Sequence, residues 1–338
     1  MSTIRQVAKL ANVSVATVSR VLNQDQTYKM TETTRKKVIS AVRELNYTLP
    51  ERRQKNAASM HHRNASFAIG CILRITKRGY NDPYYMSVLS GAEERLRESG
   101  ITLSFIQAGS LFSDQDYLNT IFEKPLHGLI LMDPLSDSIF QKIQKMVPHI
   151  VGIDTLRNEI DDVGYDHLRS GMIATRHLIE KGHTKIGFVG GSGEQETLKD
   201  SQRYQGYLIA MHQAGLPICE EWIIDCNWNE DVCLEKVDLF SKKKTLPTAL
   251  FAASDLLAMA TMKSLSLNGI SVPTQMAVIG MSNIEMSQYT NPPLTTFHVP
   301  KEEIGKVAAD LLLTKIKGNH TLPQKITLPI QFIERSST

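Results

Sequence analysis

From residue 66 onward, short apolar runs alternate with longer amphipathic stretches, and this alternation constrains the fold more than any other feature of the chain. Runs of about four to eight apolar residues are typical of strands buried on both faces, and amphipathic stretches of about ten or more are typical of the helices that cover them. The alternation therefore predicts parallel sheets with helices on both faces. Strands are predicted at Phe67–Leu73, Thr102–Gln107, Gly128–Met132, His149–Ile153, Lys185–Gly190, Ala249–Ala252, Met276–Gly280 and Ile326–Ile333, and helices near 84–99, 114–123, 137–145, 168–181, 200–214, 229–243, 254–268, 284–289 and 301–317.

This region is long enough for two such sheets, because one doubly wound sheet usually occupies about 130 residues. In open parallel sheets, ligands bind at the carboxyl ends of the strands. A ligand site is therefore predicted in the cleft between two subdomains.

The first 48 residues predict three short helices. Thr3 is placed to cap the first helix, with Gln6 three residues later. Asn12 suits a sharp turn, since asparagine tolerates a left-handed backbone. Ser14 and Thr31 are placed to cap the second and third helices. The first two helices and their turn are typical of a helix-turn-helix. Apolar stripes are predicted at Ile4, Val7, Ala8 and Leu10, at Val18, Val21 and Leu22, and at Val38, Ile39, Val42 and Leu45.

Charge is divided unevenly along the chain. Residues 1–65 hold 12 Lys or Arg against 4 Asp or Glu, a net of +8, whereas the whole chain carries only +3. A basic unit joined to an acidic one predicts that the first part meets a polyanion. Charge alone leaves nucleic acid and an anionic membrane both open.

Several classes of protein are excluded by pattern. The start has no signal-peptide pattern and no run of 18 apolar residues occurs, so a cytoplasmic protein without membrane contact is predicted. The four cysteines lack zinc-ligand spacing, and no metal is predicted. Gly190–Gly193 is the one glycine-rich loop, but it lacks the Lys-Ser/Thr of a P-loop, and no G-x-S-x-G occurs. The chain is therefore predicted not to be an enzyme and to need no cofactor.

The run Ile4–Asn23 (IRQVAKLANVSVATVSRVLN), followed by Glu44–Tyr47, closely resembles the DNA-binding headpiece of the lactose/galactose repressor (LacI/GalR) family. The resemblance continues to about residue 335, through Asn81–Tyr85, Gly182–Gly191, Arg203–Tyr207, Ser254–Asp255 and Asn291–Thr296.

The resemblance implies a small all-α helix-turn-helix headpiece joined to an α/β periplasmic-binding-protein-like effector domain of two parallel-sheet subdomains. The chain is expected to cross between the subdomains near residues 182, 297 and 325. The implied boundaries are 1–48 for the headpiece, 49–65 for the hinge and 66–338 for the effector and dimerisation domain, with subdomain one at about 66–182 plus 298–325 and subdomain two at about 183–297 plus 326–338.

The second helix has the residue types that read DNA. Small side chains allow close approach to base edges, and a forked cation can bind guanine through two hydrogen bonds. By family position, the base-reading residues are Val15, Ala16 and Arg20, and the phosphate contacts are Ser14, Thr17, Ser19 and Asn23. For Ser14, a plain helix cap is the alternative, and one hydroxyl can serve both roles.

The hinge departs from the family. A leucine usually wedges into the minor groove at the place that Lys55 or Asn56 occupies here. Either the DNA bend is weaker and arginines read groove width, or the wedge has moved to Leu49 or Met60. We favour a basic hinge helix whose minor-groove contacts are Arg52, Arg53 and Lys55.

A sugar pocket needs aromatic faces for the apolar side of the ring and charged planar groups for its hydroxyls. By family position, the effector contacts are Tyr84, Tyr85, Asp166, Arg203, Trp228, Ser254 and Ser282. Asp166 can instead be a helix cap, and core packing is the alternative for the aromatic residues. An acidic residue commonly follows the strand at Met276–Gly280, so Ser282 or Asn283 must replace it here.

The function implied is a sequence-specific transcriptional regulator, most often a repressor of a sugar-utilisation operon, whose operator binding is modulated by a small sugar. Several segments resemble regulators of β-galactosidase or galactan operons, which favours galactose or a β-galactoside. A homodimer is expected, because one helix reads too few base pairs for operator specificity. No apolar heptads follow the last strand, so no tetramer is expected. The alternative is a sugar-binding receptor without a transcriptional role, which would have no use for the first 48 residues.

Overall fold

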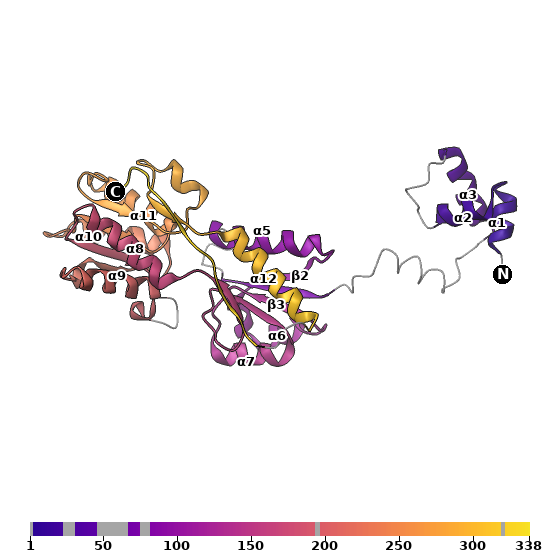
Figure 1. The fold of residues 1–338 in the computed structure, drawn as a ribbon, viewed down its shortest axis with the longest axis horizontal. Coiled ribbons are helices and arrows are strands. Elements are labelled where there is room, and N and C mark those ends of the chain that lie inside the picture. Colours follow the sequence, from indigo (N-terminus) through magenta and orange to yellow (C-terminus); the bar gives the residue numbers. More distant parts are fainter. Residues whose placement is uncertain (1–2, 23–30, 46–66, 75–81, 193–196, 319–321) are drawn as a thin grey trace. The chain divides into compact units, whose positions relative to one another are not determined.

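The structure is a computed structural model that describes residues 3–22, 31–45, 67–74, 82–192, 197–318 and 322–338 (Figure 1). The chain divides into two compact units, Met1–Ala65 and Ser66–Thr338. Among the described residues, none of the helices is long and apolar enough to cross a membrane.

The first unit holds the helices α1 (Ile4–Leu10), α2 (Val15–Leu22) and α3 (Glu32–Glu44). Thr3 and Gln6 form the predicted capping box at the start of α1. Asn12 takes the left-handed conformation, with φ of 52°, in the turn before α2. The helix-turn-helix is therefore built by the residues that predicted it.

The core of this unit is smaller than the apolar stripes predict. Leu10 is 45% exposed and Ile39 is 41% exposed, so neither belongs to it. Both lie on helices whose buried side is filled by smaller residues. The buried core consists of Val7, Ala8, Ala11, Val18, Val21, Val38 and Ala41.

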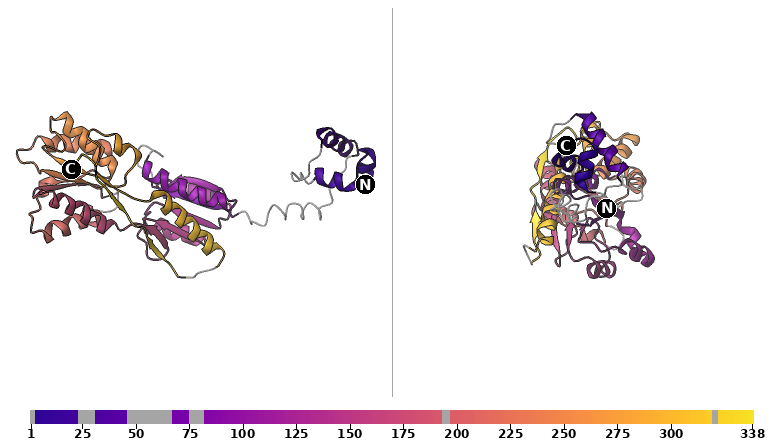
Figure 2. Two further views of the ribbon diagram at one scale, coloured as in Figure 1. Left: turned by 45° about the horizontal axis from the view of Figure 1, so that its top comes forward. Right: turned by 90° about the vertical axis from the view of Figure 1, so that its right-hand side faces the viewer.

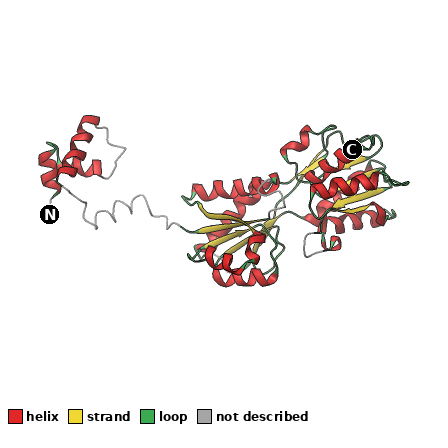
Figure 3. Cartoon of the chain, turned by 180° about the vertical axis from the view of Figure 1, so that it is seen from behind, coloured by secondary structure: helices red, strands yellow, loops and turns green. Residues whose placement is uncertain are grey.

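The second unit contains two parallel sheets covered by helices (Figure 3). The first sheet has the strand order β11-β5-β4-β3-β1-β2 and the second has the order β7-β6-β8-β9, and every pairing within them is parallel. Their strands are β1 (Ile69–Leu73), β2 (Leu103–Ala108), β3 (Gly128–Leu131), β4 (Ile150–Ile153), β5 (Asp161–Gly164) and β11 (Lys325–Thr327), then β6 (Ile186–Gly190), β7 (Ile223–Asp225), β8 (Ala249–Ala252) and β9 (Ala277–Ile279).

A short antiparallel pair joins the two halves of this unit. β10 (Thr296–His298) pairs with β12 (Gln331–Ile333), so the predicted strand Ile326–Ile333 is in fact two strands, β11 and β12. The C-terminal segment, yellow in Figure 2, runs from the first sheet to the second subdomain. The helices are α5 (Pro83–Glu98), α6 (Gln115–Ile121), α7 (Asp137–Met146), α8 (His167–Glu180), α9 (Gln202–Gln213), α10 (Glu230–Ser241), α11 (Asp255–Leu267) and α12 (Lys301–Ile316); the predicted helix at 284–289 is the 3-10 turn Glu285–Tyr289.

The first crossing between subdomains lies earlier than predicted. α8 packs against α9 and β8, which belong to the second sheet, whereas β5 belongs to the first. The crossing therefore falls between residues 164 and 167 and not near 182. The third crossing follows β11, which ends at Thr327, so the boundary predicted after residue 325 falls inside that strand. The second crossing follows β10, since α12 packs on α5 and on the first sheet (Figure 1).

Candidate functional site

A cleft lies between the two subdomains, at the carboxyl ends of their strands. Of the seven predicted effector contacts, six line it: Tyr84, Tyr85, Arg203, Trp228, Ser254 and Ser282.

Asp166 is not among the lining residues. Its carboxylate caps α8, where Oδ1 accepts a hydrogen bond from the Arg169 backbone N–H at 2.8 Å, and the side chain is exposed. The helix-cap alternative is therefore the correct one for Asp166. The next residue, His167, lines the cleft in its place.

Arg203 is held by two aromatic side chains. Its Nε donates to the Tyr165 hydroxyl at 3.1 Å, and Nη2 donates to the same oxygen. The guanidinium carbon lies 5.4 Å from the ring centroids of both Tyr165 and Trp228. Burial alone would lower the pKa of Arg203, but Tyr165, Tyr84 and Asp154 raise it above its ordinary value. The cleft thus contains a fixed, flat cation between aromatic faces.

Asp154 is an acidic residue of the cleft that interacts with Tyr84 and His167. It follows β4 directly, and its Oδ2 accepts from the Tyr84 hydroxyl at 2.6 Å. Its Oδ1 lies 2.8 Å from His167 Nε2, and the His167 ring stacks on Tyr165 with centroids 4.1 Å apart. Burial would raise the pKa of Asp154, but His167, Tyr84 and Arg203 hold it below its ordinary value. The carboxylate is therefore ionised at neutral pH.

Another part of the cleft lining comes from the start of α11 and the loop after β9, both in the second subdomain. Ser254 Oγ accepts from the Leu257 N–H at 3.2 Å and so caps α11. Asp255 is buried, and its two oxygens accept from the Thr296 hydroxyl at 2.6 Å and the Ile284 N–H at 2.8 Å. Burial raises the pKa of Asp255 to about 6, against the lowering effect of these hydrogen bonds. Ser282 lines the cleft with a φ of 123°.

Asn283, the alternative to Ser282, points elsewhere. Its side-chain oxygen accepts from Arg335 Nη2 at 2.7 Å, and it does not line the cleft. Of the two residues predicted to replace the usual acid, Ser282 lines the cleft and Asn283 does not.

Sequence reasoning missed several lining residues. Asp154 could have been found, because it directly follows the predicted strand His149–Ile153, at the edge of the sheet where ligands bind. Asp255 could also have been found, because it lies in the Ser254–Asp255 segment that resembles the family. His167, Thr155 and Leu156 carried no comparable signal. The other missed lining residues are Arg74, Asp82, Pro134, Gly191, Asp200, Ser201, Gln202, Glu230, Leu256, Leu257 and Ile284.

In the headpiece, three of the predicted DNA contacts, Ser14, Val15 and Arg20, are exposed at the start of α2 or along it. Ser14 Oγ accepts from the Thr17 N–H at 3.1 Å, so Ser14 caps the helix and its hydroxyl remains exposed. Val15 is 40% exposed, and Arg20 is exposed. Ala16 and Ser19 lie on the same helix. The predicted contacts Asn23, Arg52, Arg53 and Lys55, and the wedge candidates Leu49, Asn56 and Met60, lie outside the described residues.

Within the part of the chain that the structure describes, no group of three or more His, Cys, Asp or Glu side chains is placed to hold a metal ion.

Comparisons with known proteins cover nearly the whole chain. Residues 3–49 match the family model "Bacterial regulatory proteins, lacI family", and residues 175–338 match "Periplasmic binding protein-like domain". The HTH-type transcriptional repressor PurR of Photobacterium profundum is 34% identical over 333 residues, which are 95% of this chain and 94% of that protein.

Two solved structures share the fold. The complex of the transcriptional regulator CelR with cellobiose has a TM-score of 0.71 at 24% identity and covers 100% of both chains. The lac repressor dimer bound to operator and the anti-inducer ONPF has a TM-score of 0.71 at 22% identity and covers 99% of this chain and 98% of the other.

Proposed function

Because the chain belongs to the LacI family of bacterial regulatory proteins and not to a family of enzymes, we propose that it represses a sugar-utilisation operon and that a small sugar modulates its binding to operator DNA. The observation that carries the proposal is the presence in one chain of a capped helix-turn-helix and a cleft built around Arg203. A receptor that only bound sugar would not need the first of these, which weighs against that alternative.

On the DNA side, α2 and its capping residue Ser14 have the chemistry of a recognition helix. Arg20 offers a fork of donors for guanine, Val15 offers methyl groups for thymine, and the hydroxyls of Ser14 and Thr17 suit phosphates. One such helix reads too little sequence for an operator, so the protein binds as a homodimer. The curated relatives are named repressors, and the lac repressor structure contains a dimer on its operator, which supports this proposal. A regulator of operator DNA acts in the cytoplasm, where that DNA lies.

On the effector side, the groups in the cleft match the two kinds of surface that a sugar presents. Trp228 and Tyr85 offer aromatic faces to the apolar side of a ring. Arg203 and Asp154 offer charged donors and acceptors to neighbouring hydroxyls. We favour galactose or a β-galactoside, and the cellobiose bound by CelR is consistent with a sugar in this fold. A nucleobase could stack on the same aromatic residues, so it belongs in the test.

The test is a thermal-shift screen of neutral sugars and nucleobases, followed by operator binding measured by fluorescence anisotropy. The operator is first selected from random duplexes. Arg203→Ala should abolish the response to the sugar, because it removes a charged fork from a desolvated site, yet it should leave operator affinity without sugar within about twofold.

Arg169→Ala is the matched control, since Arg169 is an exposed arginine on α8 outside the cleft, and it should respond like wild type. If a folded Arg203→Ala variant loses operator binding without sugar, Arg203 belongs to the structural frame and the cleft assignment is wrong. If only nucleobases raise the melting temperature, the effector is a nucleobase and not a sugar, and the proposal of a DNA-binding regulator stands.

A further inference from the structure

Leu156 is placed unusually for a leucine. It lines the cleft and is 55% exposed. Its φ is 59°, a left-handed backbone conformation that residues with branched or bulky side chains rarely adopt. Exposure of a large apolar side chain and a strained backbone both cost free energy. Strain of this kind persists only where the surroundings impose it, and it is concentrated at binding sites.

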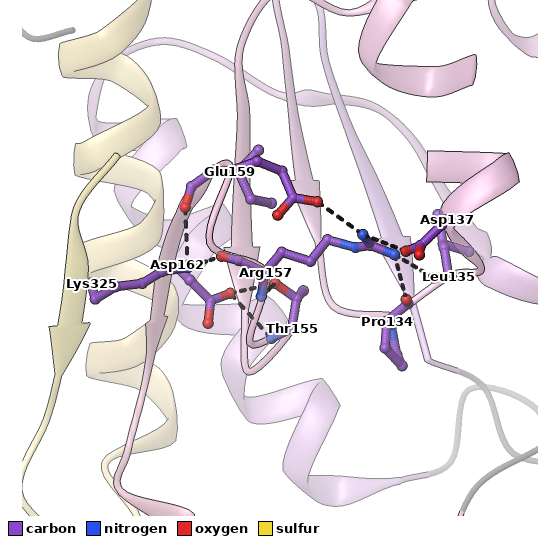
Figure 4. Close-up of polar contacts among 9 residues, drawn as sticks. Pro134, Leu135, Asp137, Thr155, Arg157, Glu159, Asp162 and Lys325 are labelled. Atoms are coloured by element: carbon purple, nitrogen blue, oxygen red, sulfur yellow. Dashed lines mark hydrogen bonds and ion pairs between the residues drawn. The ribbon is translucent and has the colours of Figure 1, made fainter. Parts of the chain in front are cut away.

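The surroundings do impose it. The buried carboxylate of Asp162 accepts hydrogen bonds from the Thr155 N–H at 3.1 Å, the Thr155 hydroxyl at 2.6 Å and the Leu156 N–H at 3.2 Å. On the other side of Leu156, Lys325 Nζ donates to the Arg157 carbonyl, and it also donates to the Ile160 carbonyl at 3.2 Å (Figure 4). The backbone is therefore fixed before and after Leu156.

The Arg157 side chain fastens the same loop to the neighbouring loop, which follows β3. Its guanidinium donates to the Pro134 and Leu135 carbonyls at 3.2 and 2.6 Å and pairs with Asp137 and Glu159 at 3.0 Å each (Figure 4). Pro134 itself lines the cleft. Two apolar residues from neighbouring loops, Pro134 and Leu156, are thus held at the cleft beside the polar group of Asp154.

We propose that Leu156 is a specificity-determining contact, which selects effectors that carry an apolar face or aglycone next to their hydroxyl groups. The inference rests on the proposed function, because it assumes that the cleft binds a small effector. A free sugar without an apolar substituent would leave Leu156 in water. A ligand with such a substituent would cover the Leu156 side chain. Because the loop is already rigid, its backbone would not have to be ordered on binding.

The experiment compares ligand pairs on the full-length protein. Methyl and phenyl β-glycosides of galactose and glucose, and of ribose, are titrated by calorimetry into wild type and into Leu156→Asn. Asparagine tolerates a positive φ, so this variant keeps the loop conformation and loses only the apolar surface. Leu156→Met restores that surface. Leu267→Asn is the control, because it removes a leucine on α11 that is also exposed, at 76%, and lies outside the cleft.

Wild type, Leu156→Met and Leu267→Asn should bind the phenyl glycoside about fivefold more tightly than its methyl partner, the gain from covering roughly half of a leucine side chain. In Leu156→Asn the ratio should fall to about one. Should this variant fail to fold, Leu156→Gly, which also suits the positive φ, replaces it.

The outcomes separate the two proposals. If glycosides bind wild type but the ratio is the same in Leu156→Asn, Leu156 does not select the effector, and the proposed function stands. If no glycoside binds wild type, the sugar effector of the proposed function fails, and the selectivity assigned to Leu156 fails with it.

Discussion

Replacing Asp162 with valine is expected to destabilise the protein, although valine is the better strand residue. Asp162 lies in β5 and is 7% exposed, and it receives three hydrogen bonds from the loop that carries Asp154 and Leu156. Valine has a similar shape but no acceptor. The substitution would therefore leave two backbone N–H groups and one hydroxyl without their partner at a mostly buried site.

The size of the effect follows from these three donors. A buried donor without a partner costs about 1–3 kcal/mol, and the Thr155 hydroxyl can turn to another acceptor. Removing a buried carboxylate recovers part of its desolvation cost, which is the reason that burial raises the pKa of Asp162. We expect a net loss of about 2–4 kcal/mol in the free energy of unfolding.

The assay is urea unfolding of the full-length protein followed by circular dichroism. Thr327→Val on the neighbouring strand β11 is the control, because it raises strand propensity at an exposed position and should change stability by less than about 0.5 kcal/mol. A stability of Asp162→Val equal to or above that of wild type would refute the reasoning, since strand propensity would then outweigh the hydrogen bonds.

Three further predictions concern pH, DNA reading and the hinge. Burial raises the pKa of Asp255 to about 6, so the folded state binds the proton of the Asp255 carboxyl more tightly than the unfolded state does. The contribution of Asp255 to the free energy of unfolding should therefore fall by roughly 3 kcal/mol as the pH rises from about 4 to 6. Asp255→Asn should lack this part of the pH dependence of the melting temperature. Arg20→Ala should cost about 1–3 kcal/mol on the operator and relax specificity at one base step, whereas an equal loss on random DNA would make Arg20 a phosphate contact. The operator should bend less in a phasing gel than with relatives that have the wedge leucine, and a sharp bend that is lost on mutating Leu49 or Met60 would show that the wedge has moved.

The parts of the fold that were predicted correctly are those in which local chemistry agrees with the final structure. The caps of the headpiece and the fully apolar strands are examples. The buried residues of these strands are apolar, and each cap provides hydrogen bonds to free backbone N–H groups of its own helix. β5 was missed for the opposite reason. It begins with Asp161 and Asp162, which resemble a turn. Hydrogen bonds from partners far along the chain, among them Lys315 and residue 324, stabilise these two buried carboxylates in a strand, and no local pattern signals them.

The misplaced crossing follows from the missing strand. Without β5, α8 looks like the helix that covers the first sheet, whereas it lies against α9 in the second subdomain. That contact depends on a close backbone approach, since a Cβ atom at Gly206 would lie 2.2 Å from the Leu168 carbonyl oxygen. No apolar period signals such an approach. The prediction of Asp166, where His167 lines the cleft, has the same origin, because the place where the chain crosses decides which residues at the start of α8 face the cleft.

Contacts at two of the crossings predict that ligand binding in the cleft is coupled to the arrangement of the two subdomains. After the second crossing, the buried Lys301 donates to the carbonyls of Ser282 and Asn283 at 2.7 and 3.2 Å, and burial lowers its pKa. Before the third, Lys325 donates to two carbonyls within the β4–β5 loop, those of Arg157 and Ile160. Each lysine ties a crossing to a loop that lines the cleft. A ligand that prefers one position of either loop therefore also favours one arrangement of the crossings, and since coupling free energies are reciprocal, a partner that fixed the crossings would change effector affinity by the same factor.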